Sequence, residues 1–229
     1  MRGIILTAAL LVAVPAAAQH NHGGAQQGGH QHGAQQGGHQ HGEAHGPPAG
    51  WVTRLDRPAS TQPVHFMDMD GRLHAILGPA AIFYNPSNTA TGAYRAQGTF
   101  VQNGTSEHPE GYGLIAGGRN LEAENQDYLY FLVRQDGKFM VKHRAGTETH
   151  TLFDWTEHSA VQRPGADGKA TNTLAIEASP AGARFLVNDT EVANIPRVPM
   201  LNTDGIVGLR VNHNLNVIID DFGIVPAAM

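Results

Sequence analysis

The sequence YLYFLVRQDGKFMVKHR, residues 128–144, decides the fold of this chain. Two runs of aromatic and aliphatic residues flank the dipeptide Asp136-Gly137, and such runs are typical of β-strands. An Asp-Gly pair between them favours a tight turn, because both residues tolerate the positive φ angles that hairpin turns need. The stretch therefore predicts an antiparallel hairpin of two strands, Tyr128–Arg134 and Phe139–Arg144, joined by a two-residue turn.

Short runs of the same kind recur from Trp51 onward, and no long stretch has the period of a helix. Apolar residues alternate with others: Val207, Leu209 and Val211 share one side of their strand, as in half-buried antiparallel strands. This pattern predicts an all-β domain, a two-sheet antiparallel jelly-roll sandwich. The other predicted strands are Val64–Met69, Leu73–Leu77, Ala81–Tyr84, Tyr94–Val101, Tyr112–Ala116, Thr149–Phe153, Thr173–Ala178, Arg184–Val187, Ile206–Val211 and Val217–Phe222, with turns at Asp70-Gly71, Pro180-Ala181-Gly182, Asn188-Asp189 and Asp204-Gly205.

The first residues of the chain predict export. Arg2 is followed by an apolar stretch from Ile4 to Val14 and then by the small residues of Pro15–Ala18. This order is typical of a secretory signal peptide, with cleavage after Ala18. The apolar stretch is shorter than the roughly 20 residues that span a bilayer. We therefore expect residues 1–18 to be a signal peptide, the mature protein to be periplasmic or secreted, and no segment to span a membrane.

Residues 19–50 consist largely of glycine, glutamine, histidine and alanine, and the unit GAQQGGHQH occurs twice in succession. Such a segment cannot bury enough apolar surface to fold, so we predict a disordered tail before a sandwich domain of residues 51–229. Neutral imidazole binds Zn, Cu and Ni, which favours metal binding by the tail with poor selectivity; a plain hydrophilic linker is the alternative. The candidate ligands are His20, His22, His30, His32, His39, His41 and His45.

Charge and cysteine content limit the expected partners. The chain has no cysteine, so the folded domain has no disulfide and depends on its own core for stability. Of the 15 Lys and Arg residues, Arg2 leaves with the predicted signal peptide, so 14 basic residues remain against 20 acidic ones. Because the basic residues form no cluster in this mildly acidic chain, we expect neither nucleic acid nor an anionic membrane as a partner.

The order of several motifs resembles the concanavalin A-like lectin/glucanase superfamily. The motifs are GYGLIAGGRN (residues 111–120), the hairpin above, Trp155, NTLAIE (172–177), RFLVNDTEV (184–192), GIVGLRV (205–211) and VIIDDFGI (217–224). The stretch from Tyr94 to Ile224 is most similar to laminin-G-like and 3-keto-disaccharide-hydrolase-like domains of exported bacterial proteins. The resemblance implies the sandwich fold, but lectins, carbohydrate-binding modules, glycosidases and adhesion modules share that fold, so it does not fix the function.

The resemblance also implies what a catalytic site would contain. Glycosidases of this superfamily carry an E-x-D-x-E motif on one strand, because glycoside hydrolysis generally needs two carboxylates. The sequence has no G-x-S-x-G elbow and no H-E-x-x-H motif either. These observations favour a protein that has no catalytic site and that requires no cofactor. The acidic pairs considered, none of which reproduces the glycosidase motif, are Glu122/Glu124, Asp68/Asp70 and Asp220/Asp221.

The hairpin predicts a ligand-binding face. A two-residue turn would pair Arg134 with Phe139 and Tyr130 with His143, so that Tyr128, Tyr130, Arg134 and His143 share one face opposite Leu129, Phe131 and Val133. Aromatic rings beside hydrogen-bonding groups suit sugars. In the alternative interpretation the tyrosines belong to the core between the sheets and Arg134 is a solvated hairpin end. Arg119, Tyr112 and Trp155 are candidates from neighbouring strands or loops.

The leading hypothesis is a non-catalytic binding protein. It would bind a glycan or another extracellular ligand on a lectin-like sandwich and transition-metal ions on its tail. Two alternatives remain open. One is a glycoside or keto-sugar hydrolase of the same fold, as the resemblance implies, and the other is a periplasmic metal-buffering protein in which the tail performs the function.

Overall fold

The computed structural model describes residues 47–198 and 201–226 of the chain. These residues form β-strands and turns, and the all-β prediction is confirmed. No helix among them is long and apolar enough to cross a membrane. The strands are β1 (Val52–Leu55), β2 (Val64–Met69), β3 (Arg72–Leu77), β4 (Ala81–Ala90), β5 (Tyr94–Asn103), β6 (Gly111–Arg119), β7 (Asp127–Arg134), β8 (Lys138–Ala145), β9 (Glu148–Glu157), β10 (Lys169–Ser179), β11 (Gly182–Val187), β12 (Thr190–Pro196), β13 (Gly205–Val211) and β14 (Leu215–Pro226).

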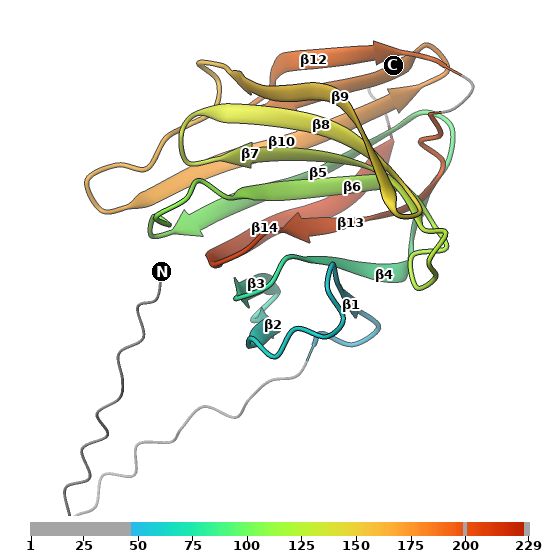
Figure 1. Ribbon diagram of the computed structural model, residues 1–229. Coiled ribbons are helices and arrows are strands. Elements are labelled where there is room, and N and C mark those ends of the chain that lie inside the picture. Colours follow the sequence, from blue (N-terminus) through green and yellow to red (C-terminus); the bar gives the residue numbers. More distant parts are fainter. Residues whose placement is uncertain (1–46, 199–200, 227–229) are drawn as a thin grey trace, which may run out of the picture. The chain divides into compact units, whose positions relative to one another are not determined.

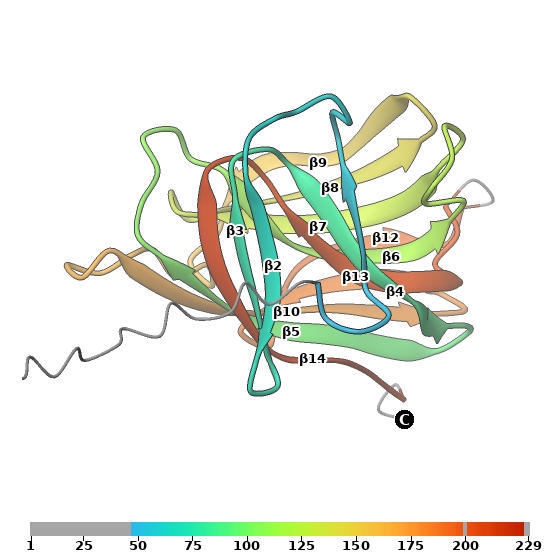
Figure 2. The ribbon, with the colours of Figure 1, turned by 90° about the horizontal axis from the view of Figure 1, so that it is seen from below.

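The strands form two antiparallel sheets of seven strands each, which pack face to face (Figure 1). The first sheet has the order β1-β4-β13-β6-β7-β8-β9, and the second has the order β12-β11-β10-β5-β14-β3-β2. The first four strands lie at the same end of the two sheets, where Figure 2 shows β2 and β3 near β1 and β4. The predicted two-sheet sandwich is therefore confirmed.

The main core lies between the two sheets. Val207, Leu209 and Val211 on β13 are completely buried, as their alternation predicts. Burial of such side chains is the principal stabilising contribution to a domain of this size, because the chain has no disulfide. Aromatic pairs join the sheets, with ring centroids 4.2 Å apart for Phe66–Phe83, 5.7 Å for Phe100–Tyr112 and 5.3 Å for Phe131–Phe185.

The predicted turns at Asp70-Gly71, Pro180-Ala181-Gly182 and Asn188-Asp189 are present, but the turn of the β7–β8 hairpin differs from its prediction. Asp70-Gly71 and Asn188-Asp189 are two-residue turns whose residues all have positive φ angles. In the β7–β8 hairpin only Gly137 has a positive φ, 82°, and a two-residue Asp-Gly turn would need positive φ at both positions. The loop consequently has three residues, 135–137, and Arg134 pairs with Lys138 rather than with Phe139.

Strand boundaries also differ from the predictions. β1 and β12 were not predicted, because each is an edge strand with few buried apolar residues. β4 continues past Pro86, although proline has no backbone N–H to donate to a neighbouring strand. This is possible because Pro86 lies between Tyr84 and Thr89, where the pairing of β4 with β13 shifts and no hydrogen bond between the strands is lost. β9 extends to Glu157, so Trp155 lies on a strand.

The predicted signal peptide, residues 1–18, and most of the predicted tail lie outside the described residues. The seven candidate metal ligands of the tail, from His20 to His45, lie there as well.

Candidate ligand-binding face

The first sheet has an outer face that points away from the second sheet. Alternation and pairing assign side chains to it: Arg54 on β1 pairs with Ile82 on β4, Tyr130 on β7 pairs with Lys142 on β8, and Tyr128 pairs with Arg144. Its apolar residues form a cluster separate from the inter-sheet core. We call the following set the outer face: Arg54, Ile82, Tyr84, Ile115, Tyr128, Tyr130, Leu132, Arg134, Met140, Lys142, Arg144, Trp155 and Arg210.

The floor of the outer face is unusually well buried for a face that no sheet covers. The exposed fractions are 1% for Tyr84, 2% for Tyr128 and 7% for Tyr130, and Ile115 and Leu132 are completely buried. Large neighbouring side chains therefore exclude water from the floor. The tyrosines are not in the inter-sheet core, as the alternative interpretation would have them, but they are too buried to stack on a sugar.

Arg210 connects this floor to the segment after β1. Its Nη1 and Nη2 donate to the two carboxylate oxygens of Asp56 at 3.0 and 2.5 Å, and Nη1 also donates to the Tyr128 hydroxyl at 3.2 Å. The guanidinium lies 5.0 Å from the ring centroid of Tyr130, within the range of a cation–π interaction. The Arg210 side chain is 10% exposed, so its charge needs the two-armed pairing to be tolerated at this depth.

Burial and charge shift the pKa values of these groups in opposite directions. Burial opposes ionisation of Asp56, but the hydrogen bonds and charge of Arg210, with smaller contributions from Arg144 and His213, outweigh it and lower the pKa of Asp56. Burial raises the pKa of Tyr128 and of Tyr130. At neutral pH the floor thus contains neutral phenols around the ion pair of Arg210 and Asp56.

Trp155 and Arg134 form one margin of the outer face. The Arg134 guanidinium lies 4.2 Å from the Trp155 ring centroid, and its Nε donates to Asp136 at 2.7 Å. Glycine at position 111 makes room for the indole, since a Cβ there would lie 2.9 Å from the ring. Trp155 is partly exposed, unlike the tyrosines, so it is the aromatic side chain of this face that a ligand can reach.

Three cations of the outer face have no carboxylate within salt-bridge distance among the residues the structure describes. They are Arg54, Lys142 and Arg144, and all three side chains are partly exposed. Arg144 donates from Nε to the Gly146 carbonyl at 2.7 Å and from Nη1 to the Thr149 hydroxyl at 3.4 Å. Arg54 has a buried Nη1 that finds no hydrogen-bond partner within the described part of the chain. The solvent-accessible parts of these three side chains can donate hydrogen bonds to a ligand.

The structure brings together four of the six predicted ligand-binding residues. Tyr128, Tyr130, Arg134 and Trp155 lie on the outer face, the first two as its floor. His143 does not lie there, because the three-residue turn pairs it with Leu129 and turns its side chain to the opposite face. The prediction that placed it beside the tyrosines is wrong by one residue of register.

His143 and Arg119 meet elsewhere, at the beginning of β7. His143 Nε2 lies 3.3 Å from Asp127, and Arg119 Nη2 lies at the same distance from another oxygen of that carboxylate. Tyr112, the further candidate, belongs to the inter-sheet core, where its hydroxyl accepts a hydrogen bond from Asn172 at 3.3 Å. Burial raises the pKa of Tyr112 to about 12.

Sequence reasoning missed several residues of the outer face. Arg210 and Asp56 are far apart in the sequence, and no local pattern relates them. A signal was present for Arg210, because it alternates with Leu209 and Val211 in an otherwise apolar strand. Lys142 and Arg144 have the same parity on β8 and would have been assigned to this face by the correct register.

The acidic pairs that the sequence offered as catalytic candidates have other surroundings. Asp68 accepts a hydrogen bond from the Gly71 backbone at 2.7 Å in the β2–β3 turn. Asp220 pairs with Arg72 on the second sheet, at 2.5 Å. Glu122 lies close enough to Tyr84 to raise the pKa of that phenol, after the larger effect of burial.

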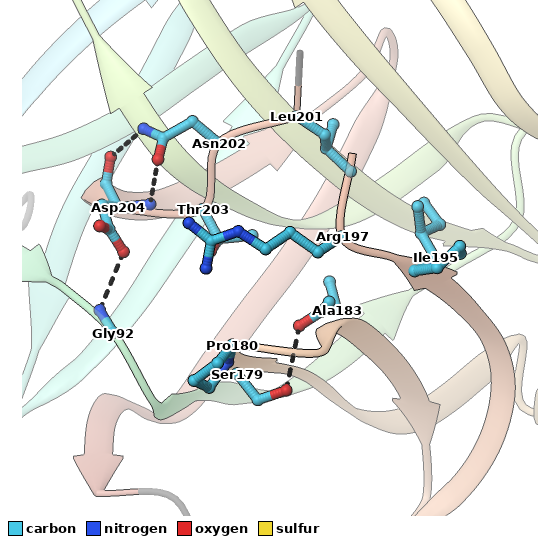
Figure 3. Close-up of a pocket in the computed structure, with 12 residues that line it drawn as sticks. Gly92, Ser179, Pro180, Ala183, Ile195, Arg197, Leu201, Asn202, Thr203 and Asp204 are labelled. Carbon is cyan, nitrogen blue, oxygen red and sulfur yellow. Dashed lines mark hydrogen bonds between the residues drawn. The ribbon is translucent and has the colours of Figure 1, made fainter. Parts of the chain in front are cut away.

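Depressions in the surface lie beside the outer face and at the far edge of the sandwich. One of about 250 Å³ is lined by Tyr84, Leu121 and Glu122, and one of about 410 Å³ lies next to Asp56 and His213. Figure 3 shows a third, of about 80 Å³, in which Asp204 accepts a hydrogen bond from Gly92 at 2.9 Å. That volume is small compared with the roughly 300–1,000 Å³ of typical ligand pockets.

The two seven-stranded sheets and their order define the class of fold, a concanavalin A-like sandwich. The chain is similar to the carbohydrate-binding module CBM66 from Bacillus subtilis, with a TM-score of 0.55 and 10% identity over 76% of this chain and 94% of that one. For the VIP36 exoplasmic/lumenal domain in its Ca²⁺/Man3GlcNAc-bound form the TM-score is 0.54, with 11% identity over 79% and 85%. For a Bacillus subtilis protein of unknown function with a galectin-like fold it is 0.51, with 9% identity over 77% and 89%.

No protein-family description matches the sequence, and no curated protein matches it. At identities this low, the similarity to solved structures establishes the fold and leaves the ligand to be argued from the residues themselves.

Proposed function

We propose that the protein is an exported glycan-binding protein that holds its ligand against the outer face of the first sheet. In this proposal the predicted signal peptide directs the chain to the periplasm or the cell exterior. The sandwich supplies a preformed binding surface and performs no reaction.

The observation that carries the proposal is the partly exposed Trp155 beside the Arg134 guanidinium, on a sheet face with further unpaired donors and a buried floor. Sugars bind to such surfaces because their C–H faces pack on aromatic rings while their hydroxyls need donors and acceptors. Lys142 and Arg144 supply donors that no carboxylate of the described residues occupies, and Thr149 and Thr151 lie opposite them on β9. The buried Tyr130 and Tyr128 pair with Lys142 and Arg144 across β7 and β8.

The carbohydrate-binding domains among the similar structures support the same proposal at the level of fold. Because they are about one-tenth identical to this chain, the positions of their ligands are not transferred to it.

A glycan array probed with the full chain tests the proposal, with Trp155→Ala as the site variant and Trp51→Phe as the matched control. Trp51 packs on Phe66 and Phe222 away from the outer face. We expect saturable binding to at least one saccharide that Trp155→Ala weakens at least about tenfold and Trp51→Phe leaves unchanged. No binding to any saccharide by a folded protein would contradict the proposal.

We also propose that the histidine-rich tail binds transition-metal ions, because six of its seven histidines form H-x-H pairs. Titration calorimetry with Zn²⁺, Cu²⁺ and Ni²⁺ tests this. Replacing the six paired histidines by glutamine should abolish the binding heat, and an unchanged isotherm would exclude the tail as the site. Growth of a tail-deletion strain under metal excess and starvation then separates metal buffering from incidental binding, since buffering requires a growth defect.

A further inference from the structure

We infer that the ligand of the outer face is an acidic glycan, one whose sugars carry carboxylate groups. This inference rests on the proposed function and specifies the chemistry that the same face selects.

Three of the six unpaired Arg and Lys side chains of the described residues lie on the outer face, although the whole chain has a net charge of −5. Most Arg and Lys side chains of the described part form ion pairs. Of those that do not, Arg54, Lys142 and Arg144 belong to this one face, and the others are Arg57, Lys169 and Arg197. An acidic protein that leaves three cations unpaired on one sheet face offers that face to an anion.

The unpaired cations lie on both sides of Tyr128 in the first sheet, Arg54 on β1 and the other two on β8, which neighbours β7. Arg144 pairs with Tyr128 across β7 and β8, and the Tyr128 hydroxyl accepts a hydrogen bond from Arg210 at 3.2 Å. Arg210 and Arg54 both pair with Ile82, from its two sides. Arg210 is already neutralised by Asp56, which leaves Arg54 and Arg144 as the free charges of the group. Lys142 lies two residues before Arg144 on β8, so their Cα atoms are about 7 Å apart along the strand.

The floor strengthens the interaction of these cations with an anion. Tyr84 and Tyr128 are neutral and buried, and water is excluded beneath the charged groups, so attraction to an anion is less screened here than on an open surface. A guanidinium presents parallel N–H donors that match the two oxygens of a carboxylate. Trp155 at the margin is placed to pack on a sugar ring. An inorganic anion has no ring for the indole to contact. A chain of uronic acids combines both features.

The test compares a hexasaccharide of galacturonic acid with its fully methyl-esterified form, in which each carboxylate charge is replaced by a neutral methyl ester. Binding to the full chain is measured by calorimetry at about pH 7.5, where the tail imidazoles are neutral, with a chelator present. We expect the acidic oligomer to bind at least about tenfold more tightly than the ester, and the difference to shrink with added salt. A sulfated oligosaccharide serves as the third ligand.

The double variant Lys142→Gln/Arg144→Gln should weaken binding of the acidic oligomer at least about tenfold and leave the ester unaffected. Lys169→Gln is the matched control, because Lys169 is an unpaired cation on β10 of the second sheet, and its binding should equal that of the unchanged chain. Circular dichroism confirms that each variant is folded.

The failures are distinguishable. Equal binding of acid and ester would overturn this inference and leave glycan binding intact, whereas failure of every saccharide on the array would overturn both. Preference for the sulfated ligand over the uronate would contradict the assignment of carboxylate as the recognised group. Equally tight binding of a single-stranded oligonucleotide would contradict the assignment to a glycan.

Discussion

Arg210 on β13 and Asp56, which immediately follows β1, form a two-armed ion pair across 154 residues of sequence. The pair fastens the first strand segment to the sheet from its outer side, at N–O distances of 3.0 and 2.5 Å. It also fixes the position of the Tyr128 hydroxyl, which accepts from the same guanidinium. The floor of the proposed binding face thus depends on a contact between an early and a late segment of the described chain.

Removing the acid of this pair should destabilise the fold more than removing an exposed acid. Asp56→Asn leaves the Arg210 charge buried without its partner, which should lower the free energy of unfolding by about 3 kcal/mol. Asp189→Asn is the control, because Asp189 pairs with Arg95 but is 80% exposed, and its cost should stay below about 1 kcal/mol. Chemical denaturation measures both, and equal losses would show that the buried pair has no special role.

The stabilisation by this pair should disappear in acid. The pKa of Asp56 is lower in the folded protein than its ordinary value, because Arg210 outweighs the effect of burial. The contribution is therefore complete above the unfolded carboxyl range, about pH 4, and is lost as the pH falls through the lower folded value. The stability difference between the unchanged protein and Asp56→Asn should narrow below about pH 4. A constant difference across that range would mean that Asp56 does not titrate as described.

All five tyrosines of the chain should resist ionisation. Burial raises the pKa of Tyr84, Tyr94, Tyr112, Tyr128 and Tyr130, that of Tyr112 to about 12. Stability from the neutral phenols is present below about pH 10, the unfolded value, and is lost as the pH rises through the folded values. The ultraviolet absorbance of tyrosinate should therefore be absent from the folded protein near pH 10 and appear together with unfolding. Stepwise ionisation before unfolding would contradict the buried placement.

Position 113 should not accept a side chain. A Cβ on Gly113 would lie 2.1 Å from the Phe131 carbonyl oxygen and 2.9 Å from Leu174, and the backbone atom cannot move away cheaply. We expect Gly113→Ala to destabilise the fold by about 2 kcal/mol or more. Gly223→Ala is the control, with nothing within 4 Å of the added methyl and an expected change within about 0.5 kcal/mol. Thermal unfolding of the two variants compares them, and equal melting temperatures would contradict the packing at Gly113.

Much of the fold could be predicted from the sequence because its signals are local. Alternation gave the buried side of β13, and Asp70-Gly71 gave a two-residue turn. The β7–β8 register could not be predicted in the same way, because it depends on whether Asp136 takes a positive φ, and only Gly137 does. That single angle decides on which face His143 lies.

The outer face could be predicted only in part. Alternation assigns each residue to one of the two faces of a sheet, but it does not determine how deeply the residue is buried there. Tyr128, Tyr130 and Arg134 were placed together correctly from their parity. Their burial could not be foreseen, since it depends on side chains from distant strands, such as Arg210 and Tyr84. The ion pair of Arg210 with Asp56 could not be predicted either, because no local sequence motif relates the two residues.

The central claim, that the outer face binds a glycan, is tested most directly by mapping the bound ligand on isotope-labelled protein. The galacturonic acid hexasaccharide is titrated into the full chain and the nuclear magnetic resonance signals of backbone and indole N–H groups are followed. We expect saturable shifts of the Trp155 indole and of amides on β7, β8 and β9, whereas the amides of β10, β11 and β12 should not shift. Saturable shifts confined to the second sheet or to the depression around Asp204, with Trp155 unmoved, would contradict this claim.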